Sequence, residues 1–427
     1  MNSIIATVLV VGQALAVGGK ADAARGGLID LAAIGEVGLT QYWEAHIPLA
    51  DGSTVARAYL VDDALYVVST SGTVFALTAE MGLIRWAANL ADRDSRIYQP
   101  AHVQTGDAAE VLVIPLPGEL LILDRFSGEG VARIPVEFAV GSAVVGYGQA
   151  LFMGGLDARF YSIAWSDRGG GQFLKRWEVR TGGPVTATPV LYGDGKLVFA
   201  SQNGTVYSCS AGDKALNWTY RTGGVILGDL VVDDTGVYVA GLDRSLHKVD
   251  LESGELLWRV RTPAPLAEGP ALTSHTVYQH CRGQGVLAID AYTGAEKWRV
   301  RDGCQFVAHI AGKAAVRTED NHLLLVEQSS GKPVRTFELG ASATVVTAPQ
   351  AEALYILGAG GHVLCIRPAD VPHLQPRQIT AARAGLRRPP VEADAEVDEV
   401  VRGAGGDESD QQLGDPLRSR RDPGGRP

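Results

Sequence analysis

Tryptophan recurs in this sequence at a nearly fixed interval, and no other feature constrains the fold as strongly. Trp177, Trp218, Trp258 and Trp298 are separated by 41, 40 and 40 residues, and each is followed three residues later by an arginine. A period of about 40 to 45 residues is typical of supersecondary units that bury a shared core only by stacking on their neighbours. The sequence therefore predicts a repeat array.

The anchor position extends beyond these four units. Trp43 and Trp86 occupy it upstream, Ala132 fills the next slot, and Phe337 follows Trp298, so that eight units result. Within each unit, apolar and polar residues alternate over short runs that are bounded by Asp, Gly and Ser, a pattern typical of half-buried antiparallel strands. Four strands per unit at this period indicate an all-β fold, an eight-bladed β-propeller of four-stranded antiparallel blades.

The two ends of the array complement each other. The eighth unit supplies three strands and no fourth, whereas residues 40–49 have the pattern of a fourth strand without its first three. We expect this N-terminal strand to complete the last blade. Such closure removes two open sheet edges that would otherwise promote association.

A glycine four residues before the tryptophan, following a Tyr-Val strand and an alternating strand, resembles the pyrroloquinoline-quinone-like (PQQ-like) β-propeller repeat. The glycine–tryptophan pairs are Gly82/Trp86, Gly254/Trp258 and Gly294/Trp298. The resemblance covers about residues 40–368 and is specific for fold rather than function, since one fold hosts many functions. The family includes quinoprotein dehydrogenases and the non-catalytic propeller lipoprotein of outer-membrane protein assembly.

Three regions follow from composition. Residues 1–25 contain an apolar run, Ile4 to Val17, and small residues near Ala23, which predict a signal peptide or hydrophobic N-terminal segment. We therefore expect export to the periplasm or cell envelope, with no membrane span in the mature chain. Residues 26–376 form the propeller. In residues 377–427, 9 arginines and 10 acidic residues without any aromatic predict a disordered charged tail, with a partner-docking tether as the alternative.

Four arginines are the candidate binding residues. Arg180, Arg221, Arg261 and Arg301 each stand three residues after a tryptophan. In a propeller, the loop that leaves the fourth strand shares a face with the turn between the second and third strands, so the four would form an arc on one rim. The turns supply Asp157, Asp243, Glu319 and Asp320 to the same face. Either these charges pair and fasten blade to blade, or the arginines bind an acidic or extended peptide.

The cysteines leave two arrangements open. Cys281 and Cys304 are expected on neighbouring blades near the same face, where an exported protein could form a disulfide if the Cα atoms lie within about 7 Å. The alternative is two buried thiols. Cys209 and Cys365 fall in third strands on opposite sides of the ring and cannot meet.

Several functional classes find no support in the residues. A net charge of −10 argues against nucleic-acid binding, which needs a basic face. His322 and His362 occupy matching slots without a third ligand, so no metal site is expected. Quinoprotein dehydrogenases, by resemblance, would have longer loops, adjacent cysteines and a calcium site. This chain has no adjacent cysteines, so we expect no cofactor.

The sequence as a whole indicates a binding scaffold rather than an enzyme. We expect protein or peptide partners at the loop-bearing face and a monomer in the absence of partners. A PQQ-dependent quinoprotein-type oxidoreductase is the alternative, and a carbohydrate-binding propeller ranks below it. The tryptophans are expected to dock neighbouring blades on one another, because a large ring at the same place in each outer strand locks sheets together. These are Trp43, Trp86, Trp177, Trp218, Trp258 and Trp298.

Overall fold

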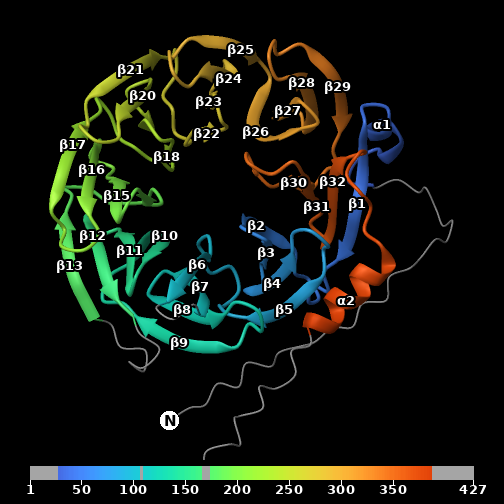
Figure 1. Ribbon diagram of the computed structural model, residues 1–427, viewed down its shortest axis with the longest axis horizontal. Coiled ribbons are helices and arrows are strands. Elements are labelled where there is room, and N and C mark those ends of the chain that lie inside the picture. The colour runs from blue at the N-terminus through green and yellow to red at the C-terminus, as the bar shows by residue number, and fades with distance from the viewer. Residues whose placement is uncertain (1–26, 106–108, 166–173, 387–427) are drawn as a thin grey trace, which may run out of the picture.

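The structure, a computed structural model, describes residues 27–105, 109–165 and 174–386 (Figure 1). Eight four-stranded antiparallel sheets surround a central axis, and each sheet forms one blade. Consecutive strands of a blade are hydrogen-bonded neighbours, with the first strand nearest the axis and the fourth outermost. The prediction of an all-β, eight-bladed propeller is confirmed.

The strands divide evenly among the blades. Blades 1 and 2 contain β2 (Val55–Val61), β3 (Ala64–Ser69), β4 (Thr73–Thr78), β5 (Ile84–Asn89), β6 (Ala101–Thr105), β7 (Ala109–Leu116), β8 (Glu119–Asp124) and β9 (Gly130–Pro135). Blades 3 and 4 contain β10 (Val140–Tyr147), β11 (Ala150–Gly155), β12 (Arg159–Ala164), β13 (Leu174–Arg180), β14 (Val190–Tyr192), β15 (Lys196–Ala200), β16 (Thr205–Ser210) and β17 (Leu216–Arg221). Blades 5 and 6 contain β18 (Val231–Val232), β19 (Gly236–Gly241), β20 (Ser245–Asp250), β21 (Leu256–Arg261), β22 (Ala271–Leu272), β23 (Thr276–Cys281), β24 (Gly285–Asp290) and β25 (Glu296–Val300). Blades 7 and 8 contain β26 (Gly303–Ile310), β27 (Lys313–Thr318), β28 (His322–Glu327), β29 (Pro333–Glu338), β30 (Thr344–Val345), β31 (Leu354–Leu357), β32 (His362–Pro368) and β1 (Leu39–His46).

The ring closes through the N-terminal strand, as expected. β1 pairs antiparallel with β32, from Leu39 opposite Pro368 to His46 opposite His362. It thereby becomes the outermost strand of blade 8, beside blade 1 (Figure 1). Closure thus joins residues that are more than three hundred positions apart in the sequence.

Burial follows strand position within each blade. Every residue of β3, β11 and β19 is buried, because these second strands are covered by neighbouring blades on both faces. Fourth strands such as β21 alternate between exposed and half-buried residues, since only one face meets a neighbour. The apolar core therefore lies between blades, in a series of interblade clusters.

Indole rings join one blade to the next. In five interfaces the ring lies against a glycine of the following blade, and the indole nitrogen donates a hydrogen bond to a nearby carbonyl oxygen. The donor–acceptor pairs are Trp43–Ala79, Trp86–Arg125, Trp218–Leu251, Trp258–Ala291 and Trp298–Gln328, at 2.9–3.2 Å. The glycines, in the same order, are Gly82, Gly128, Gly254, Gly294 and Gly331.

Glycine is required at these five positions for two reasons. Each has a φ between +67° and +74°, and a Cβ atom placed there would lie 2.4–2.9 Å from the nearest indole atom. The glycine in the Gly-x-x-x-Trp pattern therefore receives the tryptophan of the preceding blade. We name this arrangement the tryptophan lock.

One tryptophan lacks part of this lock. Trp177 is buried, but its indole nitrogen has no hydrogen-bond partner among the described residues. The turn of blade 4 that it faces carries Lys214, at φ +60°, where the other turns carry glycine. Its ring packs on Phe152 and Phe160 of its own blade, with centroid distances of 5.6 and 6.2 Å.

In the described part of the chain, two helices accompany the propeller. α1 (Leu31–Gly35) begins after Asp30, whose carboxylate accepts the amide hydrogens of Ala32 and Ala33. α2 (Pro376–Leu386) occupies the start of the segment for which the sequence predicted a disordered tail, and the structure differs from that prediction here. A half-buried face spaced three and four residues apart accounts for the helix. Residues 1–25 and the remainder of the tail, 387–427, lie outside the described residues.

Candidate functional site

The four rim arginines, Arg180, Arg221, Arg261 and Arg301, lie at or just beyond the ends of the fourth strands of blades 3–6. Register places Arg221 opposite Thr205 and Arg261 opposite Ser245, the first residues of the third strands. These arginines therefore stand beside the turns between second and third strands. We call the surface formed by these turns and the loops that leave the fourth strands the loop face.

All four rim arginines are exposed. None of their guanidinium groups forms a hydrogen bond or an ion pair with a residue that the structure describes. The arrangement in which each arginine pairs with a rim carboxylate is therefore not present in this part of the chain.

The rim carboxylates have other partners. Asp157 binds the side chains of Arg159 at 2.7 Å and Tyr161 at 2.5 Å, within its own blade. Asp243 contacts His247 at 3.0 Å and accepts a hydrogen bond from the backbone N–H of Gly223 at 3.2 Å. These carboxylates fasten turns and loops, and they form no ion pair with the rim arginines.

The two histidines of matching register each pair with a carboxylate. His322 lies 3.0 Å from Asp320, and His362 lies 2.7 Å from Glu44 on the neighbouring strand β1. Among the described residues, no group of three or more His, Cys, Asp or Glu side chains could hold a metal ion.

Two further arginines belong to the same face and were missed by sequence reasoning. Arg244 and Arg282 lie in the turns between the second and third strands of blades 5 and 6, and both are exposed. Neither makes a side-chain hydrogen bond or ion pair with a described residue. The backbone oxygen of Arg244 accepts from the N–H of Thr262 at 2.9 Å, directly beside Arg261. We name Arg244 and Arg282 the turn arginines. Their place in a turn between two predicted strands, close to glycines, is the sequence signal that could have identified them.

Apolar side chains accompany the arginines. Leu156, in a turn of blade 3, is 47% exposed, and Leu227, in the loop after Arg221, is 39% exposed. Elsewhere on the loop face, a cavity of about 470 Å³ lies between blades 1 and 2, with Asp92, Glu119 and Arg133 in its lining. Sequence analysis indicated neither feature.

The Cys281–Cys304 disulfide considered from the sequence is not formed in the structure. All four cysteines of the chain fall within the described residues, and all are free. Cys281 is buried, while Cys304 is partly buried, and burial raises the pKa of its thiol. The structure thus has the alternative arrangement, two thiols on neighbouring blades.

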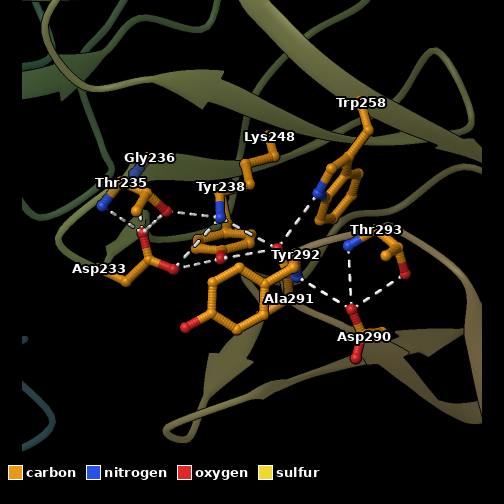
Figure 2. A network of polar contacts seen from close by, with 10 residues as sticks. All are labelled: Asp233, Thr235, Gly236, Tyr238, Lys248, Trp258, Asp290, Ala291, Tyr292 and Thr293. Atoms are coloured by element: carbon orange, nitrogen blue, oxygen red, sulfur yellow. Dashed lines mark hydrogen bonds and ion pairs between the residues drawn. The ribbon is translucent and has the colours of Figure 1, made fainter.

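A polar network joins blades 5 and 6 away from the loop face (Figure 2). The buried Lys248 ammonium contacts Thr235 at 2.7 Å, the carbonyl oxygen of Ala291 at 3.0 Å and Asp233 at 3.3 Å. Tyr238 donates to the same carboxylate and carbonyl. Burial of Asp233 disfavours its charge, but hydrogen bonds from Tyr238 and Thr235 outweigh this and lower its pKa. Because its charged groups are partnered within the network, we assign it a structural role.

Three histidines of the described residues, one buried and two half-buried, also lie between blades, each hydrogen-bonded to a tyrosine of the preceding blade. The pairs are Tyr66–His102 at 2.7 Å, Tyr220–His247 at 2.9 Å and Tyr278–His309 at 2.7 Å. Burial is the main cause that holds the pKa of all three histidines below its usual value. Two of them also face a carboxylate, Asp62 for His102 and Asp243 for His247. We call these three the interface histidines.

Comparison with known proteins places the chain in a family. The family model described as outer membrane protein assembly factor BamB matches residues 162–300 and 243–387, which together span more than half of the sequence. The chain belongs to the PQQ-like β-propeller family related to BamB. No curated protein sequence matches this chain.

Solved structures share the architecture. BamB from Moraxella catarrhalis superposes with a TM-score of 0.62 at 17% identity, covering 79% of this chain and 99% of that one. The computationally designed protein Ika8 superposes with a TM-score of 0.58 at 14% identity, covering 73% and 96%. At these identities the likeness shows the fold alone. No helix in the described part of the chain has the length and apolar character needed to cross a membrane.

Proposed function

We propose that this chain is an exported, non-catalytic scaffold whose loop face binds protein partners during assembly of outer-membrane proteins. Membership of the family related to BamB supports the setting. The main support is that all four rim arginines are exposed and that their side chains form no hydrogen bond or ion pair with a described residue. Arginines that served only to fasten blades would be expected to form hydrogen bonds or ion pairs with carboxylates or carbonyl oxygens of the neighbouring blade.

The geometry separates fastening from binding. The tryptophan locks lie at the turns between third and fourth strands, which are at the end of each blade opposite the loop face. The rim arginines therefore add no described contact to the interfaces that hold the ring together. Exposed guanidinium groups are suited to protein recognition, because their planar fork binds carboxylates and carbonyls with defined geometry.

A site-specific photo-crosslinking experiment tests the proposal. A crosslinking residue introduced at Arg221 should capture a defined envelope protein in living cells, whereas one at Arg176, exposed on the outer strand β13, should not. The captured partner should then co-purify with the wild-type chain. Equal capture from both positions would contradict a specific loop-face interaction.

A functional readout completes the test. Cells that lack this chain should assemble outer-membrane β-barrels less efficiently, and the wild-type gene should restore assembly better than Arg221→Glu/Arg261→Glu. Normal assembly without the chain would refute the proposed setting. Addition of pyrroloquinoline quinone and calcium to the purified protein serves as the check on the oxidoreductase alternative, for which saturable binding with a raised melting temperature would be required.

A further inference from the structure

Arg244 occupies a backbone conformation that disfavours an arginine. It lies immediately before the third strand of blade 5, with φ +62°. Three other blades have glycine at this place: Gly72, Gly204 and Gly361, with φ of +80°, +86° and +89°. A side chain in the left-handed region costs conformational energy that glycine avoids. Ala158 and Asn321 hold the same place in blades 3 and 7 with φ of +61° and +64°, so the turn accepts several side chains, and in blade 5 it carries an exposed positive charge.

The surroundings of Arg244 contain further positive charge. Its backbone oxygen accepts a hydrogen bond from the N–H of Thr262, and a second exposed arginine, Arg261, immediately precedes that residue. In blade 6, Arg282 and Arg301 repeat the combination of a turn arginine and a rim arginine. None of these four side chains forms an ion pair with a described residue, and like charges on one face repel each other. Blades 5 and 6 thus each present two exposed arginines on the loop face.

The arginines form a local exception in an acidic protein. The chain carries a net charge of −10, yet on the loop face of four consecutive blades six exposed arginines form no ion pair with a described residue, and the carboxylates Asp157 and Asp243 of that face are bound to other groups. A surface of this kind attracts anionic groups and repels cationic ones. Exposed leucines on the same face, Leu156 and Leu227, offer apolar contacts that a protein segment can use.

We propose that the loop face over blades 3–6 binds an extended, acidic segment of a protein partner, and that Arg244 and Arg282 are binding residues alongside the rim arginines. This inference rests on the proposed function and specifies the chemistry of the partner. Carboxylates of the segment accept hydrogen bonds from the arginine forks, while apolar residues between them contact the leucines. The binding energy offsets the conformational and electrostatic cost of the free surface.

Fluorescence anisotropy with the full-length protein tests the inference. The first probe is a labelled peptide in which glutamates alternate with serines that have a leucine on each side. The second is a matched peptide with glutamine in place of every glutamate. The acidic peptide should bind about tenfold more tightly than the glutamine peptide, and less tightly as salt is raised. Arg244→Gln/Arg282→Gln should weaken acidic-peptide binding by about tenfold.

A matched control removes two charges elsewhere. Arg176 and Lys332 are both exposed and make no side-chain contact with a described residue. Arg176→Gln/Lys332→Gln should leave peptide binding unchanged. A second readout is thermal stability. Arg244→Gly should melt at the same or a higher temperature than wild type while it binds the acidic peptide more weakly. If Arg244 served to fasten blades, the variant would melt at a lower temperature.

The outcomes separate this inference from the proposed function. Equal binding by both double variants, or equal binding of both peptides, would overturn the acidic-segment inference. Binding to vesicles of anionic phospholipid with no binding of the acidic peptide would also overturn it. If a chain with the crosslinking residue at position 221 still captures its partner after Arg244→Gln/Arg282→Gln, the proposed function stands while the inference fails. If the chain with the crosslinking residue and no other substitution captures no partner, the proposed function itself fails.

Discussion

Replacement of Gly254 by alanine measures how much the contact between a tryptophan and a turn glycine contributes to the fold. Gly254 has φ +74°, and a Cβ added to it would lie 2.7 Å from the ring of Trp218. The matched position is Gly283, which has φ +72° but no atom within 4 Å of its added Cβ. Both substitutions introduce the same backbone strain, and only one also displaces a buried indole.

The magnitudes follow from these two terms. Alanine in the left-handed region costs roughly 1–2 kcal/mol, and this applies to both variants. Gly254→Ala additionally overpacks a buried interface, which costs about 1–3 kcal/mol more. Displacement of the indole also lengthens its 2.9 Å hydrogen bond to the carbonyl oxygen of Leu251. We therefore expect the free energy of unfolding to fall by about 2–5 kcal/mol in Gly254→Ala and by about 1–2 kcal/mol in Gly283→Ala.

Urea unfolding followed by tryptophan fluorescence and by far-ultraviolet circular dichroism gives both values. The difference between the variants, rather than either value alone, isolates the indole contact, since strain cancels. An equal loss of stability in the two variants would show that the ring does not constrain the turn. The tryptophan lock would then make no measurable contribution to the free energy of unfolding.

Two further predictions concern the interfaces between blades. Trp298→Phe should destabilise the protein by about 1–2 kcal/mol more than Trp177→Phe, because only Trp298 donates an indole hydrogen bond and would leave the Gln328 carbonyl unpaired; urea midpoints that reverse this order would contradict the assignment. The free energy of unfolding should decrease as pH falls below about 6.5, because the interface histidines have lowered pKa values in the folded state and the unfolded chain binds protons first. Substitution of these histidines by glutamine should flatten that dependence in urea titrations at about pH 7.5 and about pH 5.5, whereas His280, whose pKa is raised mainly by its hydrogen bond to Glu268, acts in the opposite direction.

The blade count and ring closure were predictable because their determinants are visible in the sequence. A glycine and a tryptophan that must meet across an interface recur at a fixed spacing, and Ala132 and Phe337 could be placed in the series despite the lost indole. Lys214 marks a departure at the glycine position, and its interface is the one in which Trp177 has no hydrogen bond. At this interface the turn glycine and the indole hydrogen bond are both absent, which fits a glycine whose role is to receive the tryptophan ring.

The details of the candidate site were less predictable. The repeat places Arg261 and Asp243 on one face, but it does not specify that the carboxylate contacts His247 instead of an arginine. That choice depends on turn geometry and side-chain direction, which repeat position does not determine. The strained backbone of Arg244 was invisible for the same reason, because the left-handed region is usually inferred from a glycine. α2 was missed because its face is short and only half-buried.

The separation of the locks from the loop face explains why the rim can keep uncompensated charge. Each tryptophan lock lies at a turn between third and fourth strands, whereas the arginines lie at the other end of the blade. Residues this far apart, with no shared partner, are expected to affect stability independently. Rim substitutions should therefore change binding with little loss of stability, and lock substitutions should do the reverse. If Arg221→Gln/Arg261→Gln lowered the urea midpoint as much as Gly254→Ala, this division of roles would be wrong.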